Sequence, residues 1–141
     1  MANFADAQAV YDAIGGFMLE AAREPNMGPK IQASGILIQF RYTDPESAIT
    51  VDAKTPPPEG QFFQVYFGEP PIEPAIFMDM SADIAHQFWL GKINLTAALT
   101  RGMMKIKGPL PQVMKLLPAI TPAYKLYPEY LKAKGLGHLV P

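Results

Sequence analysis

The chain has 141 residues, and its hydrophobic content of 49% is typical of one domain with a buried core and argues against extensive disorder. Its 12 basic and 13 acidic residues nearly balance, which argues against nucleic acid as a partner because phosphate binding needs a basic surplus. The absence of cysteine excludes disulfides, thiolate metal sites and cysteine nucleophiles.

The first predicted element is an amphipathic helix over residues 3–24. Asn3 is placed to cap it, with Asp6 three residues later as in a capping box. Gly15 and Gly16 lie in its middle, where each glycine costs about 1 kcal/mol relative to alanine. We therefore expect a kink there, or close packing against another backbone. The segment EPNMGPK ends the helix. Apolar residues recur in it at helical spacing: Val10, Ile14, Phe17, Met18 and Ala21.

From residue 31 the hydrophobic period changes to two, which is typical of strands. Strands are predicted over residues 31–42, 48–54, 61–68 and 75–80, separated by the turn or loop segments TDPES, TPPPEG and EPPIEP. Because these connections are short, we expect successive strands to pair as an antiparallel meander. The residues expected to share the apolar face include Ile36, Ile38, Phe40, Tyr42, Ile49, Val51, Phe63, Val65, Phe67, Ile76, Met78 and Met80.

Helical signals return after the fourth strand. Ser81 is placed to cap a helix that runs to Leu90, with Gly91 as its stop, and Asn94 to cap a short helix that ends at Gly102. The segment MMKIK follows as a fifth strand. This order of elements predicts an α+β domain in which helices cover one face of a five-stranded, mainly antiparallel sheet.

The final predicted helices contain several prolines. One helix is expected to begin near Pro111 and to stop at Pro118, because proline lacks the N–H that the helix interior needs. Another begins at Thr121 and Pro122, and Pro128 is expected to break or restart it before it closes.

No arrangement of residues predicts catalysis. Asp79, Asp83 and His86 could form an acid–base or metal site, but a solvated helix face beside the cap explains them better, since a site needs more ligands. No phosphate-binding loop or nucleophile elbow is present. We therefore expect no catalytic residues, no metal site and no cofactor.

Aromatic and methionine residues are unusually frequent, with 11% aromatic content and 8 methionines. Phe88 and Trp89 are adjacent and cannot both face the same direction on a helix. Either the methionines fill gaps in a solid core, or an apolar cavity lies between the sheet and the helices. For such a cavity we predict these ligand-binding residues: Phe40, Phe67, Met78, Phe88, Trp89, Met103, Met114 and Leu117.

The segment IFMDMSADIAHQFWLGKINLTAALTRGMMKIKGPLPQVMKLLP, residues 76–118, resembles the signature half of the sterol carrier protein type 2 family. The resemblance lies in Gly91-Lys92, then Ala97-Ala98-Leu99, Gly102 and the run KIKG that ends at residue 108, in this order after a helix and four strands. It implies a five-stranded sheet with helices on one face and a hydrophobic tunnel between them. It also implies a non-catalytic domain that carries sterols, fatty acids, fatty acyl-CoA or other lipids, with Lys92, Lys105 and Lys107 on the water side.

The sequence thus predicts one domain, residues 1–141, with a family-like core over 3–118 and a Tyr- and Pro-rich extension over 119–141. That extension could serve as a lid, a dimer contact or a docking strap. The expected function is lipid binding and lipid transport. The alternative is an accessory subunit that presents or shields a hydrophobic substrate for a partner enzyme.

The expected ligand is a lipid or fatty acyl-type small molecule. Transient contact with a membrane surface, a homodimer and a complex with a partner enzyme are left open. The start of the chain resembles no secretory signal, no apolar run reaches the length of about 18 residues that suggests a membrane-spanning helix, and GHLVP matches no common address tag. These observations lead us to expect a cytoplasmic protein.

Overall fold

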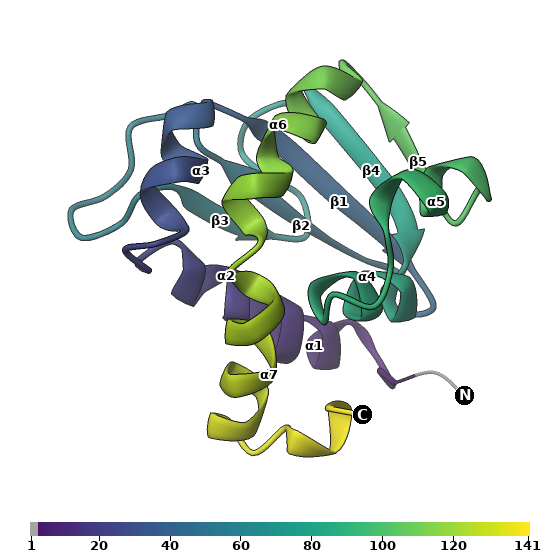
Figure 1. The fold of residues 1–141 in the computed structure, drawn as a ribbon. Helices are drawn as coiled ribbons and strands as arrows, with labels where there is room; N and C mark the ends of the chain where they lie inside the picture. The colour runs from purple at the N-terminus through teal and green to yellow at the C-terminus, as the bar shows by residue number, and fades with distance from the viewer. Residues whose placement is uncertain (1–2) are drawn as a thin grey trace.

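The computed structural model describes residues 3–141 and has the predicted α+β architecture (Figure 1). Its five-stranded sheet has the order β3-β2-β1-β4-β5. Three of the neighbouring pairs are antiparallel and one, between β1 and β4, is parallel, which confirms a mainly antiparallel sheet. The strands are β1 (Leu37–Thr43), β2 (Ser47–Asp52), β3 (Gln64–Phe67), β4 (Ile76–Ser81) and β5 (Met104–Lys107).

The predicted meander is wrong at one connection, because β4 pairs with β1 and not with β3. A parallel pair cannot be joined by a tight turn and needs a crossover. Residues 68–75, which we call the strap, make that crossover over the face of the sheet that carries Gln39, Arg41 and Phe77. The Gln39 side-chain amide donates to the carbonyl oxygen of Gly68 at 3.5 Å, near the start of the strap.

The helices lie on the other face of the sheet, as predicted (Figure 1). This inner face receives Ile38, Phe40 and Tyr42 of β1, whereas Gln39 and Arg41 point to the outer face. The helices are α1 (Ala7–Val10), a π-helical turn (Tyr11–Gly15), α2 (Gly16–Ala21), α3 (Gly28–Ser34), α4 (Ala82–Trp89), α5 (Leu95–Thr100), α6 (Leu110–Ile120), α7 (Ala123–Ala133) and a 3-10 turn (Gly137–Leu139).

The first helical segment begins later than predicted and is not regular. Asp6, not Asn3, caps it, and its carboxylate accepts from the N–H of Ala9 at 2.9 Å. A π-helical turn precedes Gly16, so the glycine pair does mark an irregularity. The Phe67 ring and the Tyr130 hydroxyl occupy the space that a Cβ would need at Gly15 and Gly16. Side chains, not another backbone, therefore pack against these two glycines.

Residues 28–34 form helix α3, where the sequence pattern predicted the beginning of a strand. Pro29 lies in the first turn, where its missing N–H costs nothing, so the proline that was interpreted as a helix end is part of a helix start. Gly35 ends α3 in the left-handed region with φ of 63°, and the strand begins only at Leu37.

Two prolines that were predicted to stop helices lie inside them. Helix α6 continues through Pro118, and α7 continues through Pro128. Each proline removes one helical hydrogen bond, yet buried Ile120 and Leu131 follow and pack into the core. Tertiary packing therefore outweighs the local cost, and α7 becomes part of the hydrophobic core.

The two predicted glycine stops are confirmed, since Gly91 and Gly102 have positive φ angles of 79° and 74°. Lys92, Lys105 and Lys107 are exposed, as predicted. Within residues 3–141, no helix has the length and apolar character needed to cross a membrane.

Candidate functional site: the apolar interior beneath α6

Two small apolar cavities of about 40 Å³ each lie between the inner face of the sheet and the helices. The α2 cavity is lined by Phe17, Met18, Ala21, Met27, Ile31, Ile36, Val51 and Phe63, and the α4 cavity by Met78, Met80, Phe88, Leu95, Val113 and Leu117. Both are also lined by Ile38, Phe40, Trp89, Leu116 and Ile120, which we call the shared wall. In the described part of the chain, these are two small spaces and not the open tunnel that the family resemblance implies.

The shared wall is built by three elements that the sequence pattern positions. Strand alternation directs Ile38 and Phe40 of β1 to the inner face. Trp89 is the last residue of α4, and its ring centroid lies 6.3 Å from those of Phe40 and Phe17. Leu116 and Ile120 are four residues apart on α6 and so share one helical face.

Five of the eight residues predicted to bind a ligand line the α4 cavity: Phe40, Met78, Phe88, Trp89 and Leu117. Phe88 and Trp89 are both buried, although they are adjacent on the helix. Trp89 packs against Phe40, whereas Phe88 lies beside Tyr124 of α7, with ring centroids 6.5 Å apart. Whether these residues contact a ligand stays a prediction.

The other three predicted residues do not line either cavity. Phe67 lies at the edge strand β3, is 40% exposed, and stacks on Tyr11 at 4.9 Å. Met114 is 37% exposed because it lies on the outer side of α6. Met103 precedes β5 and is half-buried at the margin of the core, while its neighbour Met104 takes the inward position. Phe67 thus faces the helices but lies at the edge of the sheet, away from both cavities, whereas Met103 and Met114 lie outside the cavity linings.

Sequence reasoning missed several lining residues that helical spacing could have identified. Val113, Leu116 and Ile120 recur on α6 with the spacing of a buried face, but the expected helix stop at Pro118 hid this pattern. Phe17 and Met18 were recognised as part of a buried face of the first helix, yet nothing in their spacing indicated a cavity.

The interior contains one poorly partnered polar atom close to these aromatic rings. The hydroxyl of Tyr42 is buried and has no hydrogen-bond partner of regular geometry among the described residues, although the Trp89 side chain lies close enough to interact with it. Burial raises the pKa of Tyr42, so the hydroxyl keeps its proton. The Tyr42 ring stacks at 6.5 Å from Phe40, a member of the shared wall. A hydroxyl in this position is able to donate to a polar atom of a ligand.

His86 of α4 is not on a solvated helix face, as the sequence had suggested, but is buried against α7 and the C-terminal segment. Its Nδ1 lies 2.7 Å from the Tyr127 hydroxyl and its Nε2 lies 2.8 Å from the Leu139 carbonyl oxygen. Since a carbonyl can only accept, Nε2 carries the proton and Nδ1 accepts from Tyr127. Burial lowers the pKa of His86, which favours this neutral form.

The two aspartates that were considered with His86 have other partners. The Asp79 carboxylate accepts from Arg41 at 2.6 and 2.9 Å, and Asp83 accepts from the backbone N–H of Asn3 at 2.9 Å. No group of three or more His, Cys, Asp or Glu residues in residues 3–141 could hold a metal ion.

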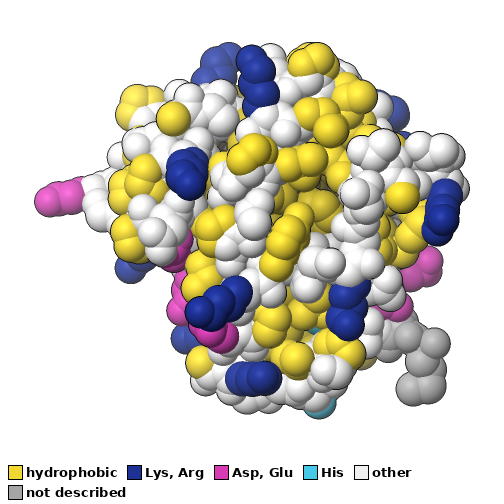
Figure 2. Space-filling model, viewed as in Figure 1, with side chains coloured by type: hydrophobic (Ala, Val, Ile, Leu, Met, Phe, Trp, Pro, Cys, Tyr) yellow, Lys and Arg dark blue, Asp and Glu magenta, His cyan; other side chains and the backbone are white. Residues whose placement is uncertain are grey.

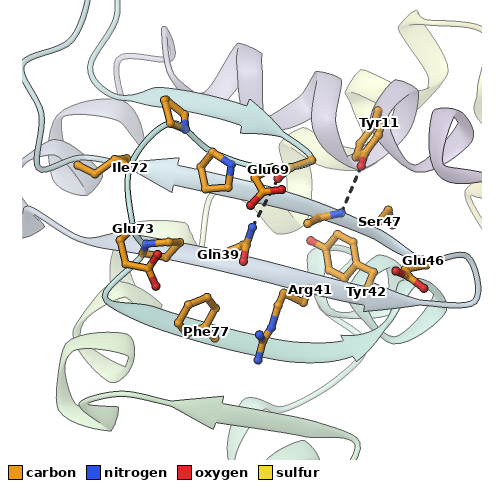
Figure 3. A pocket seen from close by; sticks show the side chains of 15 residues that line it. Tyr11, Gln39, Arg41, Tyr42, Glu46, Ser47, Glu69, Ile72, Glu73 and Phe77 are labelled. Atoms are coloured by element: carbon orange, nitrogen blue, oxygen red, sulfur yellow. Dashed lines mark hydrogen bonds between the residues drawn. The ribbon is translucent and has the colours of Figure 1, made fainter.

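A separate hollow, of about 700 Å³, lies on the outer face of the sheet beneath the strap (Figure 3). It is open and lined by polar residues, among them Gln39, Glu46, Glu69 and Glu73. The Arg41 guanidinium lies 4.4 Å above the Phe77 ring and is paired with Asp79. The unpaired carboxylates therefore give this groove an acidic character that the interior lacks.

Comparison with solved structures identifies proteins that share this fold. A sterol carrier protein 2 from Yarrowia lipolytica superposes with a TM-score of 0.62 at 17% identity over 88% of this chain and 96% of its own. A sterol carrier protein domain from Helicoverpa armigera gives 0.61 at 24% identity, over 77% of this chain and 84% of its own. UbiJ-SCP2, a ubiquinone synthesis protein, gives 0.58 at 13% identity, over 82% of this chain and 92% of its own.

No protein-family model matches the sequence, and no curated protein matches it in sequence. The structural similarity nevertheless covers most of the chain, so the protein has the sterol carrier protein 2 fold. The sequence resemblance predicted this fold correctly.

Proposed function

We propose that the protein is a non-catalytic carrier that binds a hydrophobic small molecule, of the fatty acid, fatty acyl-CoA or sterol class, between the sheet and the helices. The observation that carries this proposal is the pair of apolar cavities on either side of the shared wall. Two solved proteins of the same fold are described as sterol carrier proteins, which supports the proposal.

Binding of a lipid chain requires the interior to expand. A space of about 40 Å³ accepts only a few atoms, so a long hydrocarbon must displace side chains of the shared wall and join the two cavities. Four methionines line these cavities, namely Met18, Met27, Met78 and Met80, and their flexible side chains repack at little cost. The expected ligand-binding residues are therefore those of the cavities, including Phe40, Met78, Phe88, Trp89 and Leu117.

Helix α6 is the element best suited to move. It forms the cover of both cavities through Leu116 and Ile120. Pro118 has no N–H, so the Met114 carbonyl lacks its usual helical partner and the helix is weakened at this point. Among the helices, α6 packs chiefly against α3. We propose that α6 swings outward from the sheet when the ligand enters.

We further propose that no reaction occurs on the ligand, which agrees with the absence of a catalytic arrangement in the sequence pattern. Each titratable side chain considered for catalysis has a structural partner: Asp79 binds Arg41, Asp83 binds Asn3, and His86 binds Tyr127 and Leu139. None of these three residues lines either cavity.

The experiment uses Trp89, which is the only tryptophan and belongs to the shared wall. We expect its emission to change in a saturable manner on titration with oleate, oleoyl-CoA or cholesterol, and native mass spectrometry to detect the corresponding complex. The carrier proposal would be overturned if Trp89 emission does not change with any of the three probes and the native mass spectra show only free protein.

The second candidate function is an accessory subunit that presents or shields a hydrophobic substrate for a partner enzyme. The observation that favours it is the similarity to UbiJ-SCP2, which is described as a ubiquinone synthesis protein. The acidic groove beneath the strap would give such a partner a polar docking site separate from the apolar interior. Recovery of a stable enzyme complex from native lysate would favour this candidate, whereas lipid-loaded protein without a partner would favour the carrier.

We treat residues 1–141 as one domain in both proposals. The extension over 119–141 contributes Tyr127, Leu131 and Leu139 to the core and is connected to α4 by His86. We therefore propose that it fixes the end of α6 and thereby the cover of the cavities.

A further inference from the structure

Acidic and basic residues are concentrated in different parts of the chain, although their total numbers nearly balance. Of the 13 acidic residues, Glu129 alone lies beyond residue 91. Eight of the 12 basic residues lie there: Lys92, Arg101, Lys105, Lys107, Lys115, Lys125, Lys132 and Lys134. The segment that forms α5, β5, α6 and α7 is therefore strongly basic, while the preceding part is acidic.

These eight basic side chains are exposed and free of ion pairs in the described part of the chain. The one ion pair found within residues 3–141 joins Arg41 and Asp79, which both lie outside this segment. Unpaired, solvated cations of one sign create an attractive field for an anionic partner.

The same segment also exposes apolar surface. Leu110 is 44% exposed and Met114 is 37% exposed, and they lie one turn apart on α6. Lys115 adjoins them, and Lys125 follows on α7. Figure 2 shows apolar side chains along the middle of the face on which α6 lies, with Lys and Arg side chains around them. Helix α6 thus turns apolar residues both inward to the cavities and outward to solvent.

We propose that the outer surface of α6, with Leu110, Met114 and Lys115, together with the adjoining start of α7, with exposed Lys125, docks onto the surface of an anionic lipid bilayer. A bilayer interface offers acidic headgroups to lysines and an adjacent apolar layer to leucine and methionine side chains. Leu110 and Met114 are exposed and line neither apolar cavity, so this surface fits a flat partner better than a shaped one.

The charge distribution also orients the molecule on such a surface. Glu46, Glu69 and Glu73 surround the groove beneath the strap, on the face of the sheet opposite the helices (Figure 3). An anionic surface repels this face and attracts the side of α6. The cover of the cavities would then lie against the source of lipid, and this last step rests on the carrier proposal.

The test is co-sedimentation of the purified protein with vesicles of two compositions: phosphatidylcholine alone, and equal parts of phosphatidylcholine and phosphatidylserine. We expect binding to the anionic vesicles only, and we expect it to weaken as salt shortens the range of the charges. The double variant Lys115→Glu/Lys125→Glu should bind at least tenfold more weakly, since each lysine near an anionic surface contributes roughly fivefold.

A second double variant, Leu110→Gln/Met114→Gln, should also lose binding, because its apolar contact with the interface is removed. Matched controls are Leu19→Gln, a leucine of α2 that is 45% exposed, and Lys54→Glu, an exposed lysine outside the basic segment. Both controls should bind as the parent does. All the replaced side chains are exposed, and thermal unfolding curves of the variants check that the fold is retained.

Equal affinity for both vesicle types, or equal binding by the α6 variants and the controls, would overturn the proposal. Failure to bind either vesicle would also overturn it, which is the result expected if the surface serves an acidic protein partner. The carrier proposal fails separately, when Trp89 emission and mass spectra do not respond to the lipid probes. Vesicle binding without any lipid complex would retain the docking surface and refute the carrier.

Discussion

The two faces of the sheet present two hollows of opposite character. The groove beneath the strap is large, about 700 Å³, but it is open to solvent and lined by polar side chains. The cavities on the inner face measure only about 40 Å³ each, but they are lined by apolar side chains. Volume alone would favour the groove as the ligand site, whereas the chemistry of a hydrophobic ligand favours the interior.

The difference originates in alternation along single strands. Strand β1 directs Phe40 and Tyr42 inward and Gln39 and Arg41 outward, so one sequence of residues serves both hollows. Helices α4 and α6 cover the inner face, while the strap crosses the outer face. The inner face is thus packed and adaptable, and the outer face is solvated.

The largest expected effect is a loss of stability on removing a buried aromatic ring of the inner face, compared with removing a half-buried ring of the outer face. Trp89 is 7% exposed and belongs to the shared wall, so Trp89→Ala should destabilise the protein by about 3 kcal/mol or more. The matched change Phe77→Ala, on the outer face, should cost about 1 kcal/mol, because that ring is only partly buried. Urea unfolding measures both values. Similar costs for the two variants would show that the outer face is packed as firmly as the interior.

The sequence predicted the layers of this comparison better than their connections. Alternation identified the buried face of β1, β2 and β4 correctly, since burial of one face imposes a period of two, but at the edge strand β3 Phe67 stays 40% exposed. It could not predict the parallel pairing of β1 with β4, because the strap reads as a short loop and its path depends on tertiary packing. Part of the cavity lining was also missed because it depends on tertiary packing. Leu116 and Ile120 both line the cavities because α6 continues through Pro118.

Local signals were reliable where the physical cause is local. Ser81, Asn94, Gly91 and Gly102 cap or stop helices as expected, because these depend on a few neighbouring residues. His86 was misjudged because its partners, Tyr127 and Leu139, are distant in sequence. No spacing rule connects an α4 histidine with the C-terminal end of the chain.

The second prediction concerns the pH dependence of stability and compares a buried histidine, His86, with an exposed one, His138. Burial lowers the pKa of His86, so the unfolded chain binds a proton near pH 6.5 more readily than the folded protein does. Stability is therefore complete above about pH 6.5, falls as pH decreases below it, and levels off below the lowered pKa. The slope for this single group is at most about 1.4 kcal/mol per pH unit.

Several groups face His86 and bear on this expectation. Tyr127 and the Leu139 carbonyl contact its two nitrogens, the Phe4 ring lies edge-on at 5.5 Å, and the Asp83 charge opposes the shift. Urea unfolding between pH 5 and pH 7.5, a range chosen to bracket an ordinary histidine pKa of about 6.5, measures the slope. His86→Gln should abolish it, and His138→Gln should retain it because His138 is exposed. A slope that survives in His86→Gln would assign the effect to other groups.

The smallest expected effect compares two tyrosine hydroxyls on opposite faces of the sheet. The Tyr42 hydroxyl is buried on the inner face with only the irregular contact to Trp89 among the described residues, whereas the Tyr66 hydroxyl on the outer face donates to Gln64 at 2.7 Å. Tyr42→Phe should therefore stabilise the protein by about 1 kcal/mol, since it removes a poorly satisfied buried group. Tyr66→Phe should destabilise it by about 0.5 kcal/mol, since a solvated partner remains.

Urea unfolding should show changes of opposite sign in the free energy of unfolding of the two variants. A titration with ligand tests whether the Tyr42 hydroxyl also has a functional role. If the Tyr42 hydroxyl is kept for the polar end of a ligand, Tyr42→Phe should weaken the Trp89 response to oleate while Tyr66→Phe leaves it unchanged. A destabilised Tyr42→Phe protein would mean that this hydroxyl already has a partner, such as a buried water, and that the inner face is better satisfied than its apolar lining suggests.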